Sequence, residues 1–182
     1  KSSQAMASIT TEGQLQESLD AWEKSFAISF LGDKEKVGQL TQNLYHLLNN
    51  PYLTNEEKIK VFNLTYNYLD KIRERYPEDI KFSIFLTQFY YNFSKVDNTF
   101  IEKNIDLLRE LSALAPQRPD LYLFLADSYL LKNDLSAAQN IFDKLKDLIP
   151  HIKEIYWLKI KIDLLNNDFR EITSNLENIK NI

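Results

Sequence analysis

Histidine and cysteine, the side chains that most often bind metals or act as nucleophiles, are scarce in this sequence of 182 residues. There is no cysteine, so neither disulfide formation nor thiol chemistry is available. The two histidines, His46 and His151, do not stand at metal-ligand spacing from each other or from a glutamate. The sequence contains no glycine-rich phosphate loop, nucleophile elbow or zinc motif. We therefore expect no catalytic residue, no metal site and no cofactor, and the protein is predicted not to be an enzyme.

Adjacent carboxylates, which can support acid–base chemistry, occur at Glu56–Glu57 and Glu78–Asp79. Both pairs fall in the first turn of a predicted helix, where the helix dipole stabilises negative charge. This structural role accounts for both pairs, and no acid–base function is predicted for them.

Proline positions and the spacing of apolar residues predict about nine helices and no strand. Each of the five prolines falls at an expected helix boundary, because its ring does not fit a helix interior. Capping boxes are predicted at Thr11 with Gln14, Thr54 with Glu57 and Thr99 with Glu102. The expected helices cover residues 11–31, 33–49, 54–76, 78–94 and 99–115, with four more in residues 119–182. Their short connections imply antiparallel neighbours.

Residues 119–150 predict two amphipathic helices that pack against each other. The first carries large or small apolar side chains at i, i+3, i+4 and i+7, and the second carries an alanine, a phenylalanine and a closing proline. These residues are Tyr122, Leu125, Ala126, Tyr129, Ala138, Phe142 and Pro150. Asn133–Asp134 marks the turn, with Asp134 as the expected N-cap of the second helix. Their types and spacing resemble the tetratricopeptide (TPR) repeat.

The segment that follows is a degenerate repeat of this one, shifted by the TPR period of about 34 residues. Asn133–Asp134 recurs as Asn167–Asp168, but Lys159 and Asp163 then take the places of Leu125 and Tyr129. A slip of one residue fills the core positions instead with Trp157, Ile160 and Leu164. The sequence leaves both registers open.

The resemblance implies an all-α fold, a superhelical stack of antiparallel helix pairs known as a TPR-like α-solenoid. We expect one domain over residues 8–182, with degenerate helices in residues 11–94 and clearer repeats in residues 99–182. Residues 1–7 are expected to be an addition ahead of a cloned fragment.

A mild net charge of −4 argues against nucleic acid as a partner, and the basic stretch at residues 71–75 is expected to be one solvated helix face. The longest apolar run, residues 26–31, is far too short to cross a bilayer. We therefore expect no membrane contact by this fragment, although a fragment can lack the membrane anchor of its parent chain. These features leave the localisation open.

In the TPR family, partners usually bind a groove formed by the first helix of each repeat. Carried over to this sequence, that geometry implies a groove for a protein or peptide partner. Its expected residues are Phe89, Phe93, Leu123, Asp127, Leu130, Trp157 and Lys161. The Lys and Asn residues with which chaperone-binding members hold a C-terminal carboxylate are missing at these positions. The leading functional prediction is therefore a non-catalytic interaction or scaffold module, and not a chaperone cofactor.

A second resemblance concerns the order of segments along the whole chain. Residues 21–26, 32–35, 76–79 and 114–119 are similar in order and texture to the C-terminal repeat tails of bacterial O-antigen ligase or polymerase-type membrane proteins. This resemblance implies an alternative function: an extracytoplasmic accessory tail of a cell-envelope glycan transferase whose catalytic membrane part lies outside this sequence.

Overall fold

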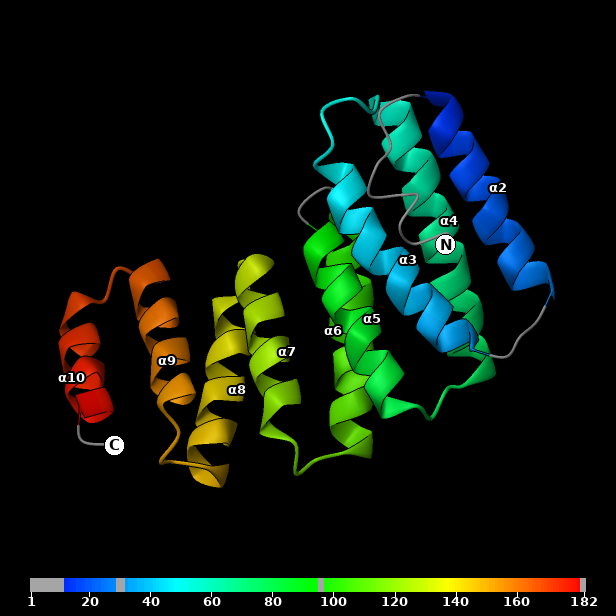
Figure 1. Ribbon diagram of the computed structural model, residues 1–182. Coiled ribbons are helices and arrows are strands. Elements are labelled where there is room, and N and C mark those ends of the chain that lie inside the picture. Colours follow the sequence, from blue (N-terminus) through cyan, green and yellow to red (C-terminus); the bar gives the residue numbers. More distant parts are fainter. Residues whose placement is uncertain (1–11, 29–31, 95–96, 181–182) are drawn as a thin grey trace. The chain divides into compact units, whose positions relative to one another are not determined.

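A computed structural model describes residues 12–28, 32–94 and 97–180 (Figure 1). Within these residues the chain forms nine α-helices and no strand, which confirms the all-α prediction. The helices are α2 (Glu12–Ile28), α3 (Asp33–Leu48), α4 (Asn55–Arg75), α5 (Ile80–Phe93), α6 (Thr99–Leu114), α7 (Pro119–Leu131), α8 (Leu135–Leu148), α9 (Lys153–Leu165) and α10 (Phe169–Lys180).

Two compact units make up the chain, Lys1–Phe82 and Ser83–Ile182. The division falls inside α5, whereas the sequence suggested a change in character between residues 94 and 99. We refer to the two parts as unit 1 and unit 2.

Unit 1 contains α2, α3 and α4, whose apolar faces form its core. Trp22, Leu40 and Leu69 are almost completely buried, and the rings of Phe26 and Tyr68 stack between α2 and α4. The helix α4 begins with the predicted capping box: the Glu57 amide donates to the Thr54 hydroxyl, and the Glu57 carboxylate accepts from the Thr54 amide. The box predicted at Thr11 lies outside the described residues.

Unit 2 is built from three helix pairs, α5 (from Ser83 onward) with α6, α7 with α8 and α9 with α10. From α6 to α10, each helix packs against the next, and Figure 1 shows α7 to α10 side by side with alternating direction. All six predicted core residues of the α7–α8 pair are buried, with exposures of 6% or less: Tyr122, Leu125, Ala126, Tyr129, Ala138 and Phe142. The central repeat was thus predicted correctly.

The turns between paired helices recur at the TPR period. Asn133 and Asn167 adopt the left-handed backbone conformation, with φ of 63° and 59°, which asparagine tolerates better than most residues. The next amide reaches back to the first helix in both turns, from Asp134 to the Tyr129 carbonyl and from Asp168 to the Asp163 carbonyl, each at 2.8 Å. The two turns are therefore copies of one structure.

Burial in α9 settles the register of the last repeat. Ile160 and Asp163 are buried, whereas Trp157 and Leu164 are each 50% exposed. The direct register, shifted by one TPR period without a slip, is therefore correct. A carboxylate, that of Asp163, occupies the place that Tyr129 takes in α7.

The α5–α6 pair is separated from the α7–α8 pair by more residues than one TPR period. Tyr76, Ala115 and Ile149 each precede a proline and end a helix in nearly the same conformation, with φ between −130° and −146°. Ala115 and Ile149 stand one TPR period apart, but the separation of Tyr76 and Ala115 is five positions longer. Since α5 and α7 begin, and α6 and α8 end, at equivalent positions, the five additional residues lie in the last part of α5, the turn and the first part of α6.

The start of α6 also differs from the prediction. Asn98 is its N-cap and makes no side-chain capping bond, so the box expected at Thr99 and Glu102 does not form. Instead, the Thr99 amide donates to the Asp97 carboxylate at 2.9 Å. The longer turn brings an aspartate of its own to this helix end, and that aspartate replaces the predicted cap.

Candidate binding surface on the first helices

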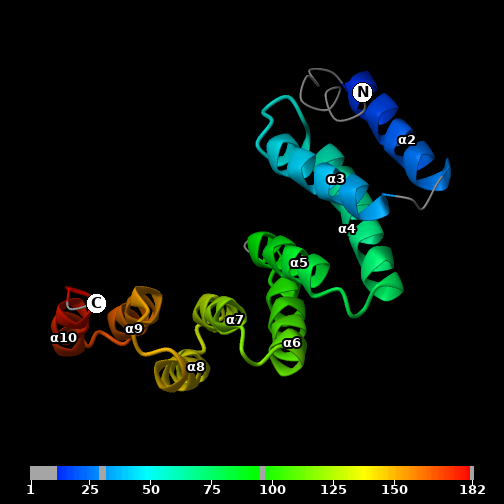
Figure 2. The same cartoon turned by 60° about the horizontal axis from the view of Figure 1, so that its bottom comes forward.

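The first helices α7 and α9 present equivalent residues in pairs, one TPR period apart. Three such pairs lie on the face that the sequence analysis assigned to a groove: Leu123 with Trp157, Asp127 with Lys161, and Leu130 with Leu164. The Lys161 ammonium donates to the Asp127 carboxylate at 2.7 Å, which shows that the two helices set these positions side by side. Figure 2 shows α7 and α9 on one side of the row and α8 on the other. We call these six residues the first-helix surface.

Apolar side chains on this surface are open to solvent. Trp157 and Leu164 are each half exposed, while Leu123 and Leu130 are half-buried beside them. A tryptophan with that much free area is a suitable anchor for a partner, because burial of aromatic side chains dominates many protein interfaces. Leu164 was not among the predicted groove residues, although shifting Leu130 by one TPR period points to it.

Phe89 and Phe93, also predicted for the groove, belong instead to the core of unit 2. Their exposures are 0% and 4%, their rings lie 4.6 Å apart, and Phe89 meets Phe100 of α6 edge to face. The prediction for these two residues was wrong because it carried the TPR period unchanged into α5. The longer shift observed there gives Gln88 and Tyr91 as the counterparts of Asp127 and Leu130.

A cavity of about 280 Å³ opens between α5 and α7, beside those two residues. One residue of α6, Asn104, also contributes to its wall. The lining consists of Thr87, Gln88, Tyr91, Asn92, Asn104, Phe124 and Asp127. Burial raises the pKa of the Tyr91 phenol, the Asp127 charge raises it further, and Lys161 opposes them. Asp127 therefore belongs both to the cavity and to the first-helix surface.

Hydrogen bonds fix the orientation of the Asn104 amide in the cavity wall. Its Nδ2 donates to the Ser128 hydroxyl at 2.8 Å, and that hydroxyl donates to the Phe124 carbonyl at 2.8 Å. Because the hydroxyl proton is committed to the carbonyl, the amide cannot be reversed without losing a bond. The Oδ1 of Asn104 is buried and has no hydrogen-bond partner among the described residues.

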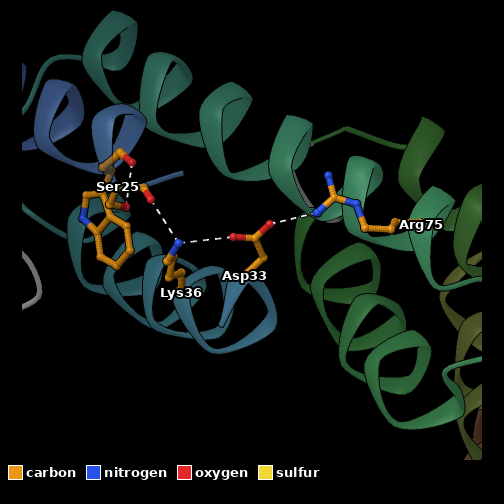
Figure 3. A network of polar contacts seen from close by, with 5 residues as sticks. Ser25, Asp33, Lys36 and Arg75 are labelled. Atoms are coloured by element: carbon orange, nitrogen blue, oxygen red, sulfur yellow. Dashed lines mark hydrogen bonds and ion pairs between the residues drawn. The ribbon is translucent and has the colours of Figure 1, made fainter. Parts of the chain in front are cut away.

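Unit 1 contains a second cluster of charged groups, around Asp33 (Figure 3). Its carboxylate accepts from Lys36 at 3.2 Å and from Arg75 at 3.0 Å, and Lys36 also donates to the Ser25 carbonyl at 3.0 Å. A cavity of about 260 Å³ adjoins this network, lined by Phe26, Ala27, Asp33, Tyr68, Lys71, Ile72 and Arg75. Asp33 is itself nearly buried and bonded to two cations, so the network serves first to tie α2, α3 and α4 together.

Neither histidine lies in these sites, and both are exposed. In residues 12–28, 32–94 and 97–180, no three or more His, Cys, Asp or Glu side chains gather closely enough to hold a metal ion. Over the same residues, no helix combines the length and apolar character needed to span a membrane.

Comparisons with known proteins identify the fold but no activity. No family model matches the sequence, and no curated protein matches it. These searches lend no support to the resemblance to O-antigen ligase tails. Among solved structures, MamA of AMB-1, a TPR-like protein, superposes with a TM-score of 0.53 at 12% sequence identity, over 90% of this chain and 91% of that one. The chain therefore has a TPR-like helical-repeat fold.

Proposed function

We propose that the protein is a non-catalytic interaction module that binds a peptide or helix of a partner protein across the first-helix surface. The observation that carries this proposal is the pairing of equivalent residues on α7 and α9, held in line by the Asp127–Lys161 ion pair. Pairing of this kind makes the two helices one surface, on which a segment of a partner can contact both.

The composition of the surface supports a protein partner. Three leucines and a tryptophan provide apolar area, and the single ion pair at the centre is neutral overall. A nucleic acid would require an excess of cations to neutralise its phosphates, and the six residues of the first-helix surface provide no such excess. A TPR-like fold is also of a kind that commonly binds proteins.

A peptide-display selection on the immobilised protein tests the proposal, with affinities of selected peptides measured by fluorescence anisotropy. Trp157→Ala removes the anchor and is expected to cost about 2 kcal/mol of binding free energy, which corresponds to a Kd raised roughly 30-fold. Because Trp157 is half exposed, the circular-dichroism spectrum and the denaturation midpoint should stay near those of the unaltered protein.

Tyr52→Ala provides the matched control, since Tyr52 is an aromatic residue of unit 1 that is 72% exposed. This variant should bind the selected peptides as tightly as the unaltered protein does. If the selected peptides bind Trp157→Ala as tightly as they bind the unaltered protein and Tyr52→Ala, the first-helix surface is not the binding site and the proposal fails.

A further inference from the structure

The first-helix surface continues onto α5 as three parallel rows of side chains. The longer shift that relates α5 to α7 assigns one α5 residue to each row, and in this way it also pairs Ile84 with Leu123. A central row of polar residues has a row of apolar or aromatic residues on each side. The central row is Gln88, Asp127 and Lys161, and the side rows are Ile84, Leu123 and Trp157, and Tyr91, Leu130 and Leu164.

Contacts within unit 2 join the three helices at the central row. Lys161 donates to Asp127 at 2.7 Å, and Gln88 lines the same cavity as Asp127. The pKa of the Tyr91 phenol is raised by burial and by the Asp127 charge and lowered by that of Lys161, so Tyr91 lies close to both charges. The central row therefore runs without a break from α5 through α7 to α9.

The side chains of the central row are open to solvent and have hydrogen-bonding groups to spare. Gln88 is exposed, and its amide makes no hydrogen bond with the described residues. Lys161 uses one of its three N–H groups on Asp127 Oδ1, which leaves Asp127 Oδ2 for another donor. The side chains of Asp127 and Lys161 are 34% and 55% exposed, and no residue of the side rows is fully buried. A molecule laid along the central row can therefore reach both donors and acceptors.

A polar row between two apolar rows fits an extended chain better than a helix. An amphipathic helix would place its apolar stripe over the central row and remove the Asp127–Lys161 ion pair from water without replacing its hydrogen bonds. An extended chain has a polar backbone along its middle, and its successive side chains point to opposite sides. With one backbone edge turned towards the central row, these side chains reach first one side row and then the other.

The spacing of the rows agrees with this arrangement. Asp127 lies four positions from Leu123 and three from Leu130 on α7, so the side rows are about 4.5 to 6 Å from the central row, within reach of a medium-sized side chain. Helices α7 and α9 are in contact, and the axes of packed helices lie about 8–10 Å apart. An extended chain, rising about 3.3 Å per residue, crosses from one to the other in about three residues.

We infer that the partner binds as an extended segment that crosses α5, α7 and α9 along the central row and carries consecutive apolar residues. This inference rests on the proposed peptide-binding function and selects a strand over a helix as the bound form. The side rows take the apolar side chains of the segment, with Trp157 as their anchor. Gln88, which was not among the predicted groove residues, binds the backbone of the segment.

Two peptide-display libraries of equal length and composition test the bound form. In one library the apolar positions are consecutive, and in the other they follow the spacing of one helix face. Selection on the immobilised full chain is expected to enrich the consecutive library at least tenfold over the helical one. The enriched peptides should bind Trp157→Ala more weakly than the unaltered protein.

Backbone N-methylation of an enriched peptide tests which of its N–H groups face the protein. Each methyl group removes one donor and leaves every side chain in place. In an extended segment, N-methylation should weaken binding about three- to tenfold at alternate positions and have little effect at the positions between them. A bound helix would be weakened at every position beyond its first turn, because its N–H groups bond internally.

Gln88→Ala tests the central row from the side of the protein. This change removes one amide and should weaken the enriched peptides about three- to tenfold. Asn140→Ala is the matched control, since Asn140 is an exposed amide of α8, and it should leave peptide affinity unchanged. Gln88 and Asn140 are both exposed, so the denaturation midpoint should stay near that of the unaltered protein in both variants.

Three results would overturn the inference and leave the proposed function intact. They are preferential enrichment of the helical library with Trp157-dependent binding, loss of affinity on N-methylation at every position, and equal affinities of Gln88→Ala and Asn140→Ala. Peptides from both libraries that bind Trp157→Ala as tightly as the unaltered protein would contradict the proposed function itself, and this inference with it.

Discussion

Lys159 and Lys161 lie two residues apart on α9 but pair with carboxylates in very different surroundings. Lys161 bonds to Asp127 on the first-helix surface, where the two side chains are 55% and 34% exposed. Lys159 bonds to Asp163, whose side chain is only 2% exposed and also accepts from the Asn175 amide at 3.0 Å. The energetic weight of an ion pair depends on how far its charges have been removed from water.

Replacing each lysine by methionine should therefore have unequal effects. Lys159→Met leaves the Asp163 carboxylate buried without its cation and is expected to lower the free energy of unfolding by about 3 kcal/mol. Lys161→Met removes an exposed pair and should cost less than about 1 kcal/mol. Urea denaturation of both variants measures the difference, and equal losses would contradict this account.

The capping box of α4 makes the stability of unit 1 dependent on pH. Hydrogen bonds from the Thr54 amide and hydroxyl lower the pKa of Glu57 below its ordinary value of 4.5, with a smaller contribution from Lys60, although burial opposes the shift. A carboxyl whose pKa is lower in the folded state stabilises that state above its unfolded pKa. The contribution is lost as the pH falls through the folded value.

Acidification from pH 6 to pH 3 should accordingly reduce the stability of the unaltered protein. In Glu57→Gln the loss attributable to this group should disappear, so the slope of unfolding free energy against pH should be shallower in that window. Denaturant titrations at several pH values provide the measurement. Identical slopes would show that the cap does not titrate with folding.

At the scale of helices, α8 and α10 occupy equivalent positions but are covered differently. Helix α9 packs on α8, and Phe142 and Leu145 are buried there. On α10, Phe169 is 66% exposed and Leu176, the counterpart of Phe142, is 39% exposed. Each repeat of a solenoid buries its apolar face against the next, so the exposed face of α10 follows from the lack of a later helix among the described residues.

The same substitution in the two helices should show this difference. Leu145→Ala is expected to cost about 3 kcal/mol, because it empties a fully buried position. Leu176→Ala, at a partly exposed position, should cost less than about 1 kcal/mol. Thermal and urea unfolding provide the comparison, and a larger loss for Leu176→Ala would mean that α10 is covered in solution.

The sequence predicts a feature of these helices correctly where the spacing of nearby residues alone determines it. Tyr122, Ala126 and Phe142 were assigned correctly, because a face of spaced apolar residues is a direct consequence of helix geometry. The register of α5 was not, since five residues added across the end of α5, the turn and the start of α6 change the shift without changing the periodicity of either helix. The cavity at Asn104 was also missed, because the position resembles an ordinary polar residue until α5 and α7 are placed around it.

At the scale of the whole molecule, the two compact units suggest separate responses to core substitutions. Leu40 in unit 1 and Leu145 in unit 2 are both completely buried. We expect Leu40→Ala to raise amide hydrogen exchange in α2, α3 and α4 while leaving α7 to α10 close to their original rates. Hydrogen exchange followed by mass spectrometry measures both regions at once.

Leu145→Ala is the reciprocal variant and should raise exchange in α7 to α10 while leaving α2 to α4 unaffected. A rise throughout the chain in either variant would show that the two units unfold as one cooperative body.

Chains built from similar helix pairs are prone to misassembly during folding, because one helix can join the wrong neighbour. In unit 2, α9 lies between two candidate partners, α8 and α10. The carboxylate of Asp163 finds the amide of Asn175 only on α10, since the equivalent residue of α8 is Ile141. A hairpin formed with α8 would leave one carboxylate oxygen against an apolar side chain, at a considerable cost in free energy. This hydrogen bond therefore favours α10 over α8 as the hairpin partner of α9.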